Sequence, residues 1–124
     1  MTQVFAIALG GAVGALLRFW MSTWVYARLG NGFPYGTLVV NVLGSLIMGV
    51  LYVLLVERLS LGVFWRAVGL IGLVGAFTTF STFSIETFNL IEGGQLIKAV
   101  MNIVLSVILC VMAAWIGVIL GRQV

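Results

Sequence analysis

The stretch from Phe77 to Ser84 concentrates side chains that could contact an ion inside an apolar segment. Five hydroxyl groups fall within residues 78–84, and phenylalanines stand at positions 77, 80 and 83. Hydroxyls donate hydrogen bonds, and an aromatic ring has a negative face and a positive edge. Donors without fixed negative charge suit a small anion that has lost its water. Without further information, packing or lipid contact explains the phenylalanines better.

The same stretch predicts a break in its helix. Serine and threonine side chains can form hydrogen bonds with the backbone of their own helix and bend it. Threonine is β-branched, which makes it unfavourable inside a helix. Gly75, just before the stretch, adds flexibility. Irregular backbone at membrane depth is tolerated only where it is buried in protein or lines a watery cavity. The alternative is an unbroken helix whose hydroxyls bond its own carbonyl groups.

Further polar side chains interrupt the other apolar segments. Asn41 lies within one of them, and Asn102, Ser106 and Cys110 follow each other at intervals of four, so they share one helix face. Polar residues in membrane spans usually face the bundle interior or a pathway. Asn41 alone could equally anchor two helices through a hydrogen bond. Glu86 is the only acid placed well inside an apolar segment.

The composition requires a membrane around these residues. Of 124 residues, 63% are hydrophobic and 7% are charged, whereas a soluble domain is about 25% charged. A spanning helix needs about 20 mostly apolar residues. Four segments satisfy this, at about 4–26, 36–56, 63–90 and 96–120. The sequence therefore predicts an all-α membrane protein with one domain over 1–124, whose short connections make consecutive helices antiparallel.

Other functional classes find no support in the sequence. The six basic residues are scattered, so no cluster could follow a nucleic-acid backbone. The chain has no histidine and one cysteine, and it shows no nucleophile–base pair or metal cluster of an enzyme. It also lacks the glycine-rich motif of ATP-driven transport. We therefore expect a protein that is neither an enzyme nor an ATP-driven transporter.

The basic residues give little preference for one orientation in the membrane. Lys and Arg normally concentrate on the cytoplasmic side. The end with both termini carries Arg58, Arg66 and Arg122, and the other end carries Arg28 and Lys98, with Arg18 added if it reaches outward. This near tie predicts dual topology, in which molecules insert both ways and pair as an antiparallel homodimer. The alternative is a weakly biased single orientation.

Three motifs in order carry a family resemblance. They are GGAVGALLR at 10–18, GTLVVNVLG at 36–44 and GLVGAFTTFSTFSIE at 72–86. Together they resemble the Fluc (CrcB) family of fluoride channels, over nearly the whole chain. The resemblance implies an inverted homodimer with two pores, which lets fluoride leave the cytoplasm passively across the inner (plasma) membrane of a bacterium and so gives fluoride resistance.

The resemblance also implies roles for single residues. Asn41 would be a pore-lining donor, and Phe80 and Phe83 would turn ring edges to the ion. Ser106 and Cys110 resemble a polar track on the fourth helix, although the family often has serine at the second position and a larger side chain at Asn102. Four more residues would form the polar side of the route: Thr79, Ser81, Thr82 and Glu86. Arg18 resembles a vestibule arginine.

The family resemblance further implies a sodium ion at the dimer interface. Main-chain carbonyl groups of the broken third helix would hold it, at Gly75 and Thr78 of both subunits. The main alternative function is a small multidrug exporter, also a four-helix inverted dimer. Such an exporter needs a carboxylate inside the membrane to exchange protons, and the first helix has none. A structural or membrane-remodelling protein is a second alternative, although it would not need the hydroxyls.

Overall fold

The computed structural model describes residues 1–59 and 61–124, and every element in this part of the chain is helical. Residue 60, in the connection expected at 57–62, lies outside the described residues. The elements follow one another in this order: α1 (Thr2–Leu29), α2 (Tyr35–Tyr52), η1 (Val53–Arg58), α3 (Val63–Arg66), η2 (Ala67–Val74), α4 (Gly75–Phe77), α5 (Phe80–Glu92) and α6 (Leu96–Gln123).

Four helical segments are long and apolar enough to cross a membrane. They are Thr2–Leu29, Tyr35–Arg58, Val63–Glu92 and Leu96–Gln123. Each of the spans expected from the sequence lies within one of them. The prediction of an all-helical chain with four such helices is therefore confirmed, and the chain is a multi-pass membrane protein.

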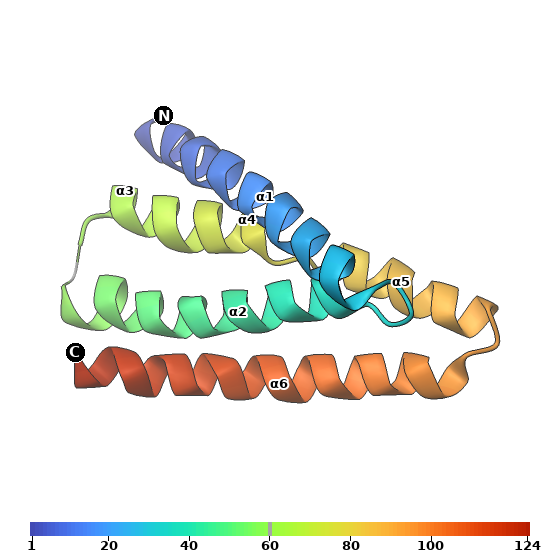
Figure 1. Cartoon of the computed structure of the whole chain (residues 1–124). Helices are drawn as coiled ribbons and strands as arrows, with labels where there is room; N and C mark the ends of the chain where they lie inside the picture. The colour runs from blue at the N-terminus through green and yellow to red at the C-terminus, as the bar shows by residue number, and fades with distance from the viewer. Residues whose placement is uncertain (60) are drawn as a thin grey trace.

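The helices form layers, with α2 in the middle (Figure 1). On one side of α2 lies α6, and on the other lies the row of α3, η2 and α4, which α1 crosses. Both termini and the connection from η1 to α3 lie at one end of the molecule. After α4 the chain continues into α5, which runs toward the opposite end of the molecule.

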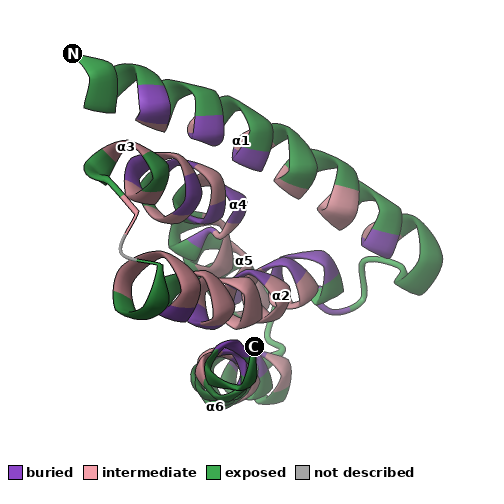
Figure 2. Ribbon diagram, turned by 90° about the vertical axis from the view of Figure 1, so that its left-hand side faces the viewer, coloured by how far each residue is buried: buried purple, intermediate pink, exposed green. Residues whose placement is uncertain are grey.

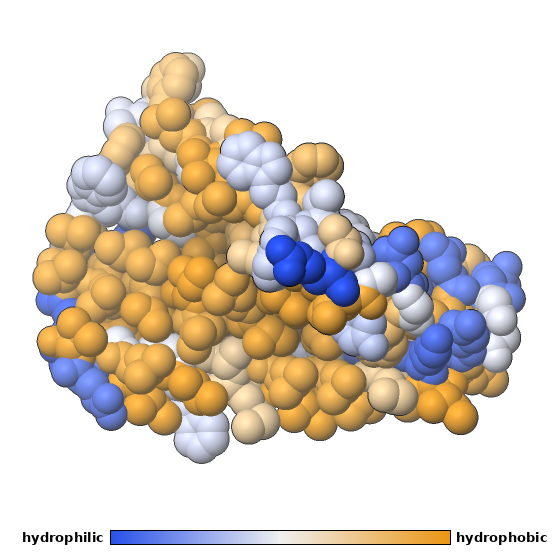
Figure 3. Space-filling view, in the orientation of Figure 1, coloured by the Kyte–Doolittle hydropathy of each residue, from blue (hydrophilic) through white to orange (hydrophobic). Residues whose placement is uncertain are grey.

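The surface of the single chain is largely apolar. The buried positions of α1 face the other helices, and exposed residues cover the outer faces of α1 and α6 (Figure 2). On the face seen in Figure 3, hydrophilic residues gather mainly toward the two ends of the helices. Large side chains such as Trp20, Trp115 and Phe80 are more than half exposed. Lipid or a protein partner must cover such a surface.

Glycines allow the closest helix contacts. A Cβ atom added at Gly14 of α1 would lie 2.2 Å from the carbonyl oxygen of Leu73 in η2. A Cβ added at Gly49 of α2 would lie 2.2 Å from the carbonyl oxygen of Ala114 in α6. Small residues at these positions let the backbones touch, as in other membrane helix pairs. These contacts hold α1 against η2 and α2 against α6.

Two extended residues separate α4 from α5. Thr78 has φ −85° and ψ 158°, and Thr79 has φ −150° and ψ 114°, whereas Phe77 and Phe80 are helical. The sequence did not indicate a second irregularity, the wider π-helical winding of η1 and η2. π-helical turns within α-helices are often found near functional sites. Thr78 and Thr79 lie where the two halves of the third span meet.

Candidate functional site

Asn41 of α2 binds the backbone of Thr79 with both atoms of its amide. The N–H of Thr79 donates to Oδ1 of Asn41 at 2.8 Å, and Nδ2 of Asn41 donates to the Thr79 carbonyl at 3.0 Å. An extended residue between two helices has no helical partner for these groups. Leaving each of them unpaired in a buried position costs about 1–3 kcal/mol. Asn41 therefore stabilises the step between α4 and α5 from a neighbouring helix.

The Thr79 side chain caps the beginning of α5. Its Oγ1 accepts the backbone N–H of Thr82 at 3.2 Å and lies 3.0 Å from the Thr82 hydroxyl. Threonine is a favoured residue at this N-cap position. The first N–H groups of a helix are free of intrahelical partners and carry the positive end of its dipole. The start of α5 therefore offers a region that favours negative charge.

A groove of about 420 Å³ lies beside this step. It is lined by seven of the residues that the sequence singled out, namely Asn41, Thr78, Thr79, Phe80, Phe83, Ser106 and Cys110. The Phe80 and Phe83 ring centroids are 5.3 Å apart, with an angle of 41° between the planes. Phe80 is 78% exposed. The groove is therefore open to the surroundings on the side of Phe80.

A second, polar pocket of about 220 Å³ contains most of the remaining expected residues. Arg18, Thr82 and Glu86 line it, and Thr79 lines both this pocket and the groove. Ser81 lines neither space; it is exposed, with its hydroxyl 3.3 Å from that of Thr79. The residues expected from the sequence thus line two separate spaces, and Thr79 is the one residue in both linings.

Two hydroxyl groups that the sequence reasoning missed hold Glu86 in the polar pocket. Tyr26 of α1 donates to Oε2 of Glu86 at 2.5 Å, and Thr37 of α2 donates to Oε1. The Tyr26 and Thr37 oxygens are 3.3 Å apart. The only sign of them in the sequence is that each is a polar residue near the end of an apolar helix. Their common partner belongs to a distant part of the sequence.

Asn102 lies on the same helix face as Ser106 and Cys110 but has different surroundings. It is 2% exposed and does not line the groove. Its Nδ2 donates to the hydroxyl of Thr87 at 2.9 Å, and Thr87 donates to the Phe83 carbonyl at 2.7 Å. Ser106 donates to Oδ1 of Asn102 at 3.4 Å. A chain of hydrogen bonds thus links the backbone at Phe83 to Ser106 of the groove.

The carbonyl groups of Gly75 and Thr78 lose the partners that a continuous helix would give them. The N–H of Thr79 would bond Gly75 in such a helix, but it donates to Asn41. The N–H of Thr82 would bond Thr78, but it donates to the Thr79 hydroxyl. Carbonyl oxygens freed in this way can coordinate a cation, as unwound segments of membrane transporters do.

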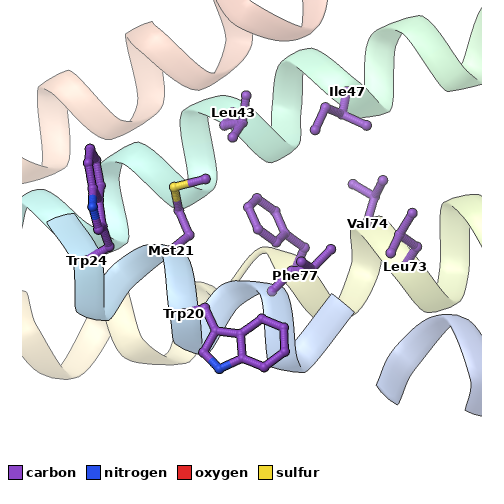
Figure 4. A pocket seen from close by; sticks show the side chains of 9 residues that line it. Trp20, Met21, Trp24, Leu43, Ile47, Leu73, Val74 and Phe77 are labelled. Carbon is purple, nitrogen blue, oxygen red and sulfur yellow. The ribbon is translucent and has the colours of Figure 1, made fainter. Parts of the chain in front are cut away.

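An apolar groove lies on another side of α2 (Figure 4). It has a volume of about 630 Å³ and is lined by Leu17, Trp20, Met21, Trp24, Leu43, Ile47, Leu73, Val74 and Phe77. Phe77 is buried and its ring points into this groove. Of the three regularly spaced phenylalanines, only Phe80 and Phe83 therefore reach the groove that carries Asn41. Val74 lines both grooves.

Comparison with known proteins assigns the chain to a family. Residues 5–118 match the family model described as CrcB-like protein, Camphor Resistance (CrcB). The chain belongs to the CrcB family. The match covers all four spanning helices except their outermost residues, and it includes every residue that lines the groove and the polar pocket.

Several bacterial relatives of this CrcB chain are named fluoride-specific ion channel FluC. The protein of Methylococcus capsulatus is 54% identical over 121 residues, which cover 98% of this chain and 53% of that longer protein. A Coxiella burnetii protein is 50% identical over 122 residues, and 98% of each chain is covered. A Geobacter metallireducens protein is 42% identical over 129 residues, with 99% of each covered. Ion channels are not enzymes, in agreement with the sequence analysis.

Proposed function

We propose that this chain forms a fluoride-selective channel, through which fluoride crosses the membrane passively. The observation that carries the proposal is the groove in which Asn41, Phe80, Phe83 and Ser106 meet beside the start of α5. The relatives named as fluoride-specific channels support it, since they align with nearly the whole chain.

The lining of the groove favours an anion over a cation. No carboxylate is among its lining residues. Amide and hydroxyl donors, the positive end of the α5 dipole and the edges of two phenylalanine rings all favour negative charge. Fluoride is small and strongly hydrated, so it needs closely spaced donors to replace its water. The groove and the polar pocket, which share Thr79 in their linings, both offer such donors.

We further propose that two copies of the chain pair in opposite orientations, so that each groove becomes an enclosed pore. A single chain leaves Phe80 78% exposed and leaves the apolar groove beside α2 open. Val74 lines both grooves, so a second copy over this region would cover them together. The near tie of basic residues between the two ends supports insertion in both directions. Two grooves in such a dimer would give two pores.

The orientation of the copies can be tested by labelling. A cysteine added after Val124, in a Cys110→Ser background, would report which side of the membrane holds the C-terminus. A membrane-impermeant maleimide added to intact cells should then label about half of the copies, because dual topology places the C-terminus on each side equally. Labelling of all copies, or of none, would show a single orientation.

A sodium ion at the dimer interface is a further part of the proposal. The carbonyl groups of Gly75 and Thr78 would hold it, and the diversion of their helical partners to Asn41 and Thr79 supports this fit. The ion would stabilise the step in the third span and supply no other chemistry. Replacing sodium by N-methylglucamine should lower the melting temperature of the purified dimer. An unchanged melting temperature would remove sodium from the proposal.

The step between α4 and α5 is, in this proposal, the functional break of the third span. The membrane would be the inner (plasma) membrane of a bacterium, as the bacterial relatives suggest. Fluoride that enters as weakly acidic hydrogen fluoride and ionises in the cytoplasm would leave through the pores. Expression in a bacterium that has lost its own fluoride export should restore growth in fluoride. Failure to restore growth, with the protein present in the membrane, would count against export.

A further inference from the structure

Arg18 and Glu86 carry opposite charges and line the same polar pocket, yet they do not pair. Within residues 1–59 and 61–124, the ion pair that forms is between Arg122 and Glu57, at 3.1 Å, near the end with both termini. Opposite charges at membrane depth attract more strongly than in water, because the surroundings have a low dielectric constant. The separation of Arg18 from Glu86 therefore requires a structural cause.

The cause lies in the two hydroxyl groups that bind the carboxylate. Tyr26 donates to Oε2 of Glu86 and Thr37 donates to Oε1, so each oxygen has a partner. Hydrogen bonds to a charged acceptor are roughly twice as strong as those between neutral groups. Tyr26 belongs to α1 and Thr37 to α2, so two helices other than its own hold the carboxylate of Glu86 in α5.

Tyr26 and Glu86 also lie between two pockets, because both residues belong to both linings. Both residues line the pocket of Arg18, and both line an outer pocket with Asn31, Pro34 and Asn89 near the end of the molecule. No other residue is shared by the linings of these two pockets. An anion that enters from this end therefore meets the Tyr26–Glu86 pair before it reaches Arg18.

We propose that Tyr26 and Thr37 are positioning residues that keep Glu86 from pairing with Arg18. The guanidinium group then stays available to attract an anion into the polar pocket, which a guanidinium paired with a carboxylate could not do. This inference rests on the proposed fluoride permeation. The inference explains why Arg18 stays unpaired, and it gives a role to two residues outside the groove, Tyr26 and Thr37.

The test uses Tyr26→Phe, which removes the hydroxyl and keeps the ring. Fluoride efflux from liposomes is measured over a range of fluoride concentrations. Once Oε2 loses its donor, the carboxylate should turn toward Arg18, and efflux at low fluoride should fall roughly tenfold, because local attraction of the anion is lost. The loss should shrink at high fluoride and with added inert salt, which screens the attraction. Tyr52→Phe, an exposed tyrosine in α2, is the matched control and should behave as the unchanged protein.

A double variant separates this role from simple packing. In the E86Q background no carboxylate is left to pair with Arg18, so Tyr26→Phe should cause no further loss. If Tyr26→Phe lowers efflux by the same factor with and without Glu86, or does not lower it at all, the inference is wrong.

A structure of the Tyr26→Phe variant provides a second measurement that needs no flux. The Glu86 carboxylate should lie within about 4 Å of the Arg18 guanidinium, the usual limit of an ion pair. A carboxylate that still binds only Thr37 would overturn the inference. If the unchanged protein carries no fluoride, the proposed function fails, and this structure still decides whether Tyr26 separates the two charges.

Discussion

The side-chain amide of Asn41 forms two hydrogen bonds with the backbone of Thr79, 2.8 Å and 3.0 Å long. One residue of α2 thereby satisfies both polar backbone groups of an extended residue in the third span. The Thr79 hydroxyl in turn caps α5 and lies between the groove and the polar pocket. A single side chain thus shapes the point at which the two spaces of the proposed route meet.

Asn41→Leu should abolish fluoride flux and destabilise the protein. The substitution leaves the N–H and the carbonyl of Thr79 without partners, at a cost of about 1–3 kcal/mol each, and it removes an amide donor from the groove. We expect a lower melting temperature in detergent, a dimer that still forms, and no efflux from liposomes. Gln3→Ala, at an exposed position of α1 that lines none of the described pockets, serves as the control. Normal efflux through Asn41→Leu would show that this amide does not serve the ion.

Replacing Phe80 or Phe83 by isoleucine should slow fluoride efflux by about fivefold to tenfold. A favourable aromatic contact contributes about 1 kcal/mol beyond its buried area, and isoleucine has no ring edge. Phe88→Ile is the matched control, because Phe88 is exposed on the same helix and does not line the groove. Equal rates in all three variants would assign Phe80 and Phe83 to packing alone.

Asn102→Leu should lower stability by about 1–3 kcal/mol, since Thr87 loses a donor and Ser106 loses its acceptor. Thr87→Val breaks the same chain of hydrogen bonds. Because both changes remove one shared interaction, the double variant should lose less stability than the sum of the single variants. Thermal unfolding in detergent measures all three. Simple additivity would indicate that the two side chains do not interact.

Gly14→Ala and Gly11→Ala form a matched pair that tests the contact between α1 and η2. An alanine Cβ at position 14 would lie 2.2 Å from the Leu73 carbonyl oxygen, whereas position 11 has no heavy atom within 4 Å. Overpacking of this kind costs about 1–3 kcal/mol, while alanine in an open helix position is favourable by up to about 1 kcal/mol. Only Gly14→Ala should lower the melting temperature. The opposite ranking would mean that α1 does not pack closely there.

The sequence predicted the parts of the site that depend on local composition. Apolar segments of sufficient length revealed the four helices. The hydroxyl cluster at 78–84 includes Thr79, whose side chain caps α5. The helical spacing of Ser106 and Cys110 correctly put them on one face, and both line the groove. These features follow from periodicity and from residue type, which a sequence displays directly.

The remaining features depend on contacts between distant parts of the chain. Asn102 shares the spacing of Ser106, but its amide is turned to Thr87 of another helix. The phenylalanines repeat evenly, yet the two extended residues after Phe77 send its ring to a different groove. Tyr26 and Thr37 act through Glu86, which is 60 and 49 residues away in the sequence. No local pattern announces such partners.

The central claim is that donors and ring edges along the groove replace the water around a fluoride ion. Efflux from liposomes that contain the purified protein tests it most directly, with fluoride-loaded and chloride-loaded vesicles measured side by side. We predict rapid loss of fluoride down its gradient and retention of chloride. Fluoride retained as well as in protein-free vesicles, or chloride released at the same rate as fluoride, would contradict the account.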